Sequence, residues 1–276
     1  MSVKRKALIQ SVKLVALVLI FWWILTPFVS LVLWSVAIRW YWPNPIPQEL
    51  GMDYWLEALG LRKGYAIGAV SIVDAFWNSV TIALIVTPLT LAISLPTSYA
   101  LARYRIPYKP ALIFLFLMPQ AFPLQPVYIN LMRIFYSLDL VGTIPGVVIA
   151  HVVPSLVFAI WINTATFKAI PPVLEEAARM SGASSITTFF RVTFPLATPG
   201  ILASSVFVFL YSFDEFMGTF FIGLPSVVTL PMLLYSASGY NMQFASATAI
   251  VLLLSSIVFM LFLERFLKPE YLGRIG

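Results

Sequence analysis

The chain has 276 residues and a net charge of +6, with only 10% charged and 61% hydrophobic residues. Soluble domains contain roughly 25% charged residues, so a water-soluble fold of this size could not bury so much apolar surface. The chain has no cysteine, which excludes disulfides, thiolate metal sites and a cysteine nucleophile. These figures favour one polytopic membrane domain over one or two soluble domains.

Six apolar stretches are each long enough to cross a bilayer as a helix, which takes about 20 residues. In chain order they cover residues 14–38, 75–102, 110–132, 140–167, 199–220 and 245–263. Backbone groups inside lipid must be hydrogen-bonded within the segment, so we predict helices rather than strands. The first stretch is too long for the apolar region of a signal peptide, about 7–15 residues, so we expect it to be retained.

Lysine and arginine residues predict which side of the membrane each connection occupies, because they collect on the cytoplasmic side. With six spans and an inner N-terminus, 13 of the 17 would lie inside. The four outer ones are Arg39, Arg62, Lys63 and Arg133. We therefore predict an N-in, C-in, multi-pass protein of the inner or plasma membrane, with a first span plus outer loop over residues 13–75.

Two apolar segments depart from a plain helix. Pro119, Pro123 and Pro126 interrupt the third stretch. They either kink the span and expose polar backbone to a central path, or mark the end of a shorter helix. Residues 221–244 hold no charge but many small and helix-breaking residues, so we expect a re-entrant or interfacial loop buried against protein.

A charged, Ser/Thr-rich segment follows the fourth stretch, on the predicted cytoplasmic side. Pro172 suits the first position of a helix, and Glu175 and Glu176 suit its first turn. Gly182 comes where a left-handed turn would end that helix, and Ser184 can cap a second one. The sequence FPLATPG should then break the chain and start the fifth span. We predict two short helices along the membrane surface, either docking another protein or forming an amphipathic linker.

Four residues in or beside the apolar stretches are candidates to line a translocation path, namely His151, Tyr211, Asp214 and Glu215. Ionisable groups inside membranes are costly and usually face a cavity or a partner. His151 can instead be a packing residue with satisfied hydrogen bonds, and both acids would be solvent-exposed if the fifth span ended before them. With a single histidine and no cysteine, we expect no metal site and no catalytic site.

One motif in the polar segment resembles the EAA signature of permease subunits from binding-protein-dependent ATP-binding-cassette (ABC) importers. It consists of Glu176, Ala177, Ala178, Gly182, Val192, Phe194 and Pro195. Similarity to this family also extends to NSVTIALIVTPLTLAISLPTSYALARYR, SFDEFMGTFF and TLPMLLYS, so that it covers about residues 76–267. Ser181 departs from the pattern, because sugar-importer relatives usually carry Asp there.

The resemblance implies an all-α, type I importer permease fold in one domain, residues 1–276, with a core at 76–267 and a cytoplasmic coupling segment at 171–196. It implies that an ABC ATPase dimer receives this segment in a cleft. The docking residues would be Glu175, Glu176, Ala177, Ala178, Gly182 and Pro195, with Glu176 as the main polar anchor.

The resemblance also implies partners and a solute. We expect a second permease subunit forming a heterodimer, an extracytoplasmic substrate-binding protein, and ATP with Mg²⁺ on the ATPase, while this chain binds no cofactor. The chain lacks the glycine-rich phosphate-binding sequence of ATPases, and its basic residues indicate topology in a lipid bilayer rather than nucleic-acid binding. Its motifs look most like polyamine and phosphonate permeases, so we expect a small organic ion. A carbohydrate importer is the alternative, and an ATP-independent channel or secondary transporter is a further one.

Overall fold

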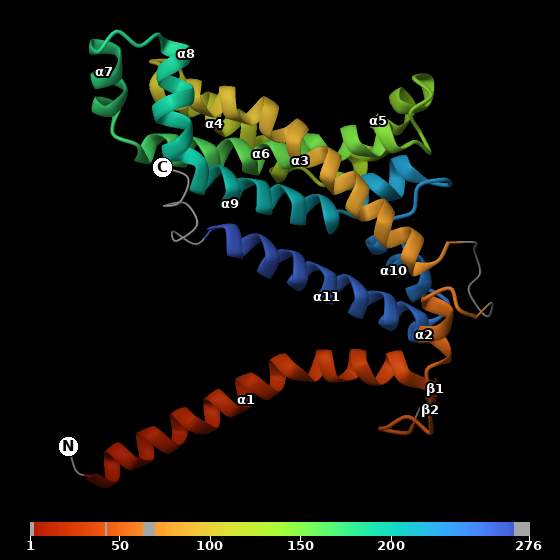
Figure 1. Ribbon diagram of the computed structural model, residues 1–276. Helices are drawn as coiled ribbons and strands as arrows, with labels where there is room; N and C mark the ends of the chain where they lie inside the picture. The colour runs from red at the N-terminus through yellow and green to blue at the C-terminus, as the bar shows by residue number, and fades with distance from the viewer. Residues whose placement is uncertain (1–2, 42, 63–69, 268–276) are drawn as a thin grey trace. The chain divides into compact units, whose positions relative to one another are not determined.

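The computed structural model describes residues 3–41, 43–62 and 70–267, which are almost entirely helical (Figure 1). The chain divides into two compact units. One comprises Met1–Val73 and Leu233–Val251, and the other Asp74–Met232 and Leu252–Gly276. The organisation as one permease domain stays a prediction.

The first unit starts with α1 (Val3–Val36), followed by β1 (Ala37–Arg39), β2 (Glu49–Leu50) and α2 (Asp53–Ala58). The two strands pair antiparallel. The sequence analysis did not predict this small hairpin. The connection between its strands contains Pro43, Pro45 and Pro47, which disfavour a helix there because proline lacks the N–H that a helix needs.

The second unit holds most of the remaining elements. They are α3 (Ile72–Arg103), α4 (Lys109–Leu117), η1 (Met118–Ala121), α5 (Leu124–Ser137), α6 (Ile144–Ala169), α7 (Pro172–Met180), α8 (Ser185–Thr188), η2 (Phe189–Thr193), α9 (Phe194–Phe213) and η3 (Thr219–Gly223). The last two helices, α10 (Leu230–Ser238) and α11 (Met242–Leu267), have residues in both units, as does α3, whose first two residues belong to the first unit.

Five helical segments in the described part of the chain are long and apolar enough to cross a membrane. They are Val12–Val36, Ile72–Arg103, Ile144–Ala169, Ser185–Phe213 and Met242–Phe262. A sixth candidate is a pair of segments, Lys109–Ala121 and Leu124–Ser137, bent by 91°. The expected all-α, polytopic fold with about six spans is thus confirmed.

The third span is not one straight helix. α4 ends at Leu117, Pro119 lies in η1, and Pro123 is the residue that precedes α5. Because proline cannot donate a backbone hydrogen bond, these residues end α4 and redirect the chain. Of the two interpretations left open by the sequence, the structure favours the end of a shorter helix over a kink in a long one.

The expected chain break at FPLATPG was wrong. The chain stays helical from Ser185 to Phe213, passing through the π-helical segment η2 directly into α9. The N–H of Phe194 bonds to the carbonyl of Phe189, one residue farther back than in an α-helix. This wider turn precedes Pro195, whose ring would otherwise clash with a carbonyl of the preceding turn. The fifth span therefore begins well before Pro199.

The connection after the fifth span is buried at its start, as expected from its uncharged sequence. Thr229 and Leu230 have exposed fractions of 1% and 0%. Two side chains of α3 hold this stretch: Asn78 Nδ2 donates to the Val228 carbonyl at 2.9 Å, and Ser79 Oγ accepts from the Leu230 N–H at 2.9 Å. The nine residues of α10 are too few to cross a bilayer.

The centre of the second unit is the packing of α6 along α9. A close approach occurs at Gly200, where an added Cβ would lie 2.2 Å from Thr166 Oγ1. Glycine is therefore required there by space rather than by backbone angles. This helix pair carries a candidate site at each end, because α6 leads into α7 at one end and α9 ends near His151 at the other.

Candidate functional site

The polar segment folds as the predicted helix, glycine turn and start of a second helix, but this second helix continues into the fifth span instead of ending (Figure 1). Pro172 occupies the first turn of α7. Gly182 has φ +89°, a conformation that L residues with a Cβ rarely adopt. Ser184 Oγ accepts a hydrogen bond from the Thr187 N–H at 3.2 Å and so caps α8. Sequence alone therefore located the turn and both helix starts.

Glu175 is fully buried and holds this segment to the spans. Its carboxylate accepts from Arg103 Nε at 2.8 Å, from Thr193 Oγ1 at 3.0 Å and from Tyr99 Oη at 3.1 Å. Arg103 also donates from Nη2 to the Ile170 carbonyl at 3.0 Å. The carboxylate thus joins the ends of α3 and α6 to α7 and η2. It points inward, away from the side where a partner could contact it.

The opposite face of α7 is exposed. Glu176 and Ala177 lie on it, flanked by Val173 and Met180, which are 61% and 89% exposed. Residues three, four and seven apart share a helix face, so these four form one surface with an apolar rim and a central carboxylate. The sequence analysis missed Val173 and Met180, although their spacing of seven could have identified them.

The remaining predicted docking residues lie elsewhere. Ala178 is half-buried, Gly182 is exposed in the turn, and Pro195 is exposed in the first turn of α9. The structure therefore groups Glu176 and Ala177 on one surface, places Glu175 beneath them, and puts Pro195 in the span. Pro195 affects how the fifth span starts and is not part of the exposed face of α7.

His151 and Glu215 form a buried cluster at the far end of α6. His151 Nδ1 lies 3.0 Å from Ser212 Oγ, and its Nε2 lies 3.0 Å from both Thr219 Oγ1 and Glu215 Oε2. The Gly218 N–H donates to both oxygens of Glu215, at 3.0 and 2.9 Å. Each polar group has partners and the imidazole is fully buried. This geometry favours the interpretation of His151 as a packing residue with satisfied hydrogen bonds.

Asp214 and Tyr211 are more exposed to solvent than their neighbour Glu215. α9 ends at Phe213, so the fifth span stops before both acids, yet only Asp214 is exposed. Ser256 Oγ donates to Asp214 Oδ1 at 3.1 Å. The alternative of two solvent-exposed acids is thus right for Asp214 and wrong for Glu215, and a role for either acid in the path stays a prediction.

An open depression of about 440 Å³ lies beside the end of α9. Its lining is Phe207, Leu210, Tyr211, Asp214, Glu215, Phe216 and Met217. Phe207, Tyr211 and Phe158 of α6 are in contact, with ring centroids 5.0 to 6.5 Å apart. Aromatic faces next to a carboxylate can hold a molecule that has both an apolar surface and hydrogen-bonding edges.

The long apolar helices, with the exposed polar helix α7 between two of them, define a multi-pass membrane protein. The chain belongs to the family described as binding-protein-dependent transport system inner membrane component, which its residues 64–271 match. It is thus the multi-pass inner-membrane permease subunit of an ABC importer, and a separate subunit hydrolyses the ATP. Membership excludes the ATP-independent channel or secondary transporter that the sequence had left open.

Named relatives support the same family, and a solved structure supports the fold. The chain is 31% identical to the trehalose transport system permease protein SugB of Mycobacterium tuberculosis over 70% of this chain and 72% of that protein. It is 32% identical to the sulfoquinovosyl glycerol transport system permease protein SmoH of Agrobacterium fabrum, over 56% and 55%. A chain in the crystal structure of a bacterial ABC transporter that imports alginate has a similar fold, with a TM-score of 0.69 and 17% sequence identity. The match covers 97% of this chain and 99% of that one, and it supports the fold.

Proposed function

We propose that this permease carries a carbohydrate, and that the depression beside α9 contacts the sugar. The relatives named above are permeases for trehalose and sulfoquinovosyl glycerol, and the similar fold comes from an importer of a polysaccharide. This favours the carbohydrate alternative over the organic ion that we expected from the motifs.

The observation that carries this proposal is the combination of Phe207, Tyr211 and Asp214 around one depression. Residues 207, 211 and 214 share a helix face, because they are four and three positions apart. A sugar ring presents C–H groups on its faces and hydroxyls on its edge. The aromatic rings suit the faces, and the exposed carboxylate of Asp214 can accept from the hydroxyls.

The acids give less support to a polyamine. A polyvalent cation would be bound best by carboxylates that are free to face it. The Glu215 carboxylate is buried against His151 and the Gly218 N–H, and only Asp214 is exposed. One exposed carboxylate among aromatic rings fits a neutral polyhydroxyl compound better than a multiply charged one.

We further propose that the exposed face of α7 docks on the ATPase, with Glu176 as its polar anchor. A charge surrounded by apolar Val173 and Met180 is typical of an interface residue that becomes desolvated on binding. A second permease subunit and an extracytoplasmic substrate-binding protein complete the proposed importer. ATP and Mg²⁺ then belong to the ATPase.

The test of the substrate class uses the binding protein that assembles with this chain. Its thermal unfolding would be followed with trehalose, a panel of oligosaccharides, putrescine and an alkylphosphonate. A ligand present at 100 times its Kd stabilises by about 2.7 kcal/mol, which is readily measured. A sugar should stabilise the binding protein and stimulate ATP hydrolysis by the reconstituted importer. Stabilisation by putrescine or the phosphonate alone would overturn the proposal.

A further inference from the structure

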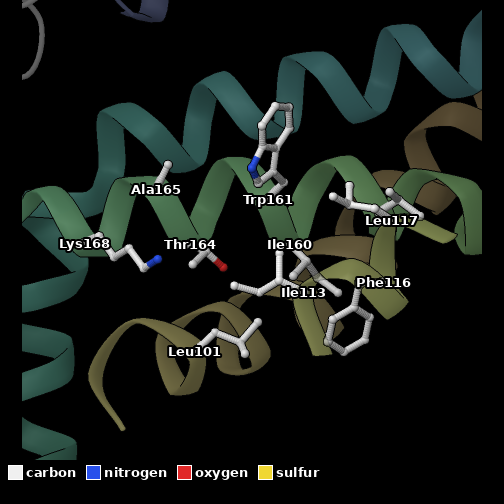
Figure 2. Close-up of a pocket in the computed structure, with 10 residues that line it drawn as sticks. Leu101, Ile113, Phe116, Leu117, Ile160, Trp161, Thr164, Ala165 and Lys168 are labelled. Carbon is white, nitrogen blue, oxygen red and sulfur yellow. The ribbon is translucent and has the colours of Figure 1, made fainter. Parts of the chain in front are cut away.

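We infer that a groove between α3, α4 and α6 binds one acyl chain of an anionic phospholipid, with its headgroup at Lys168. The groove has a volume of about 130 Å³ (Figure 2). Its lining is Leu101, Ile113, Phe116, Leu117, Val157, Ile160, Trp161, Thr164, Ala165 and Lys168. The inference is independent of the solute that the importer carries.

Two polar side chains enter the groove from the same face of α6. Thr164 and Lys168 are one helical turn apart, and Figure 2 shows both leaving α6 on the side of Leu101 and Ile113. Thr164 is only 6% exposed, and its hydroxyl has no hydrogen-bond partner among the residues that the structure describes. A buried hydroxyl left without a partner is costly, so this one indicates a ligand oxygen or nitrogen that completes it.

The charge at the end of the groove is positive. Lys168 is exposed, and the described part of the chain contains no salt bridge to it. Lys109 starts α4, four residues before Ile113, which lines the groove. None of the ten lining residues is acidic. By our topology this end is cytoplasmic, where basic pockets between membrane helices bind anionic headgroups.

The lining of the groove favours a lipid chain over a sugar. Sites for small polar molecules carry several convergent polar groups, whereas eight of the ten lining residues here are apolar and leave few partners for sugar hydroxyls. A helix of a partner protein, about 10 Å across, is too wide to enter. A single acyl chain is narrow and apolar. The ester carbonyl that attaches it to the lipid can accept a hydrogen bond from Thr164, and the phosphate of the lipid headgroup can pair with Lys168.

Photocrosslinking in the assembled, reconstituted importer tests the inference. The vesicles would contain phosphatidylglycerol or phosphatidylcholine with a diazirine in the acyl chain, and crosslinked peptides would be identified by mass spectrometry. We expect phosphatidylglycerol to label residues 109–117 and 157–168 preferentially. Lys168→Gln should reduce this labelling about fivefold, because one lysine near an anionic lipid contributes about 1 kcal/mol.

Three further variants make the result decisive. Ala165→Phe should block the groove and reduce labelling by both lipids, whereas Thr164→Val should weaken labelling with little change in volume. Lys13→Gln, on α1, removes a cytoplasmic charge outside the groove and should leave labelling unchanged. Equal labelling by both lipids, or full labelling of Lys168→Gln, would overturn the inference. So would crosslinking of Ala165→Cys to the second permease, since a protein would then cover the groove.

Discussion

Arg103 Nε lies 2.8 Å from Glu175 Oε1, joining two residues that are 72 positions apart at the end of α3 and in the first turns of α7. The Glu175 side chain is 1% exposed and that of Arg103 is 11% exposed. A buried carboxylate is tolerated only with a partner and further hydrogen bonds, which Thr193 and Tyr99 supply here. Movement of α7 must therefore be transmitted to α3 or break this network.

The first prediction concerns Glu175→Gln. Removing one charge of a buried pair leaves Arg103 unpaired and typically costs about 3–5 kcal/mol. We expect α7 to loosen from α3, so that ATP hydrolysis by the assembled importer becomes largely independent of substrate. Proteolysis of the α6–α9 connection should accelerate. Unchanged protease resistance together with normal substrate stimulation would show that the pair does not position α7.

Glu176→Lys should act differently, because this side chain is exposed and makes no salt bridge within the part of the chain that the structure describes. The permease should reach the membrane in normal amount, but the ATPase should no longer co-purify at wild-type stoichiometry. Glu49→Lys, an exposed acid on the predicted outer side, is the control and should leave ATPase binding intact. Normal co-purification and transport by Glu176→Lys would refute the docking role.

Gly182 variants test the turn between α7 and α8. A Cβ at this position would meet nothing within 4 Å, so any effect inside the chain comes from the backbone angle alone. A residue with a Cβ pays about 1–2 kcal/mol in this left-handed conformation, a β-branched one more, and asparagine least. Coupling of ATP hydrolysis to uptake in proteoliposomes should therefore decline from wild type through Asn and Ala to Val. A Val variant with wild-type coupling would contradict the requirement for a left-handed turn.

The depression beside α9 is tested by Tyr211→Ala and Asp214→Asn. Loss of aromatic contact is worth about 0.5–1.5 kcal/mol, so Tyr211→Ala should weaken apparent substrate affinity about two- to tenfold. Asp214→Asn should also lower uptake while assembly persists. Glu215→Gln is the comparison, since it perturbs the cluster around His151 and should lower thermal stability as well. Uptake with wild-type KM and rate in both Tyr211→Ala and Asp214→Asn would exclude this surface from the path.

The sequence by itself determined the class of the protein and the form of its polar segment. Apolar runs longer than about 20 residues can be stable only as membrane helices, and this is a property of local composition. Pro172, Gly182 and Ser184 likewise determined where α7 starts and ends and where α8 starts, because caps and left-handed turns depend on single residues and their immediate neighbours.

The tertiary structure decided what each polar side chain does. Glu175 and Glu176 are adjacent and chemically alike, yet one is buried on Arg103 while the other is exposed. Asp214 and Glu215 divide in the same way. Neighbouring residues on a helix point about 100° apart, and which direction faces protein depends on helices distant in sequence. The burial of the Thr164 hydroxyl, which has no partner among the described residues, likewise depends on helices distant in sequence, so local patterns could not reveal it.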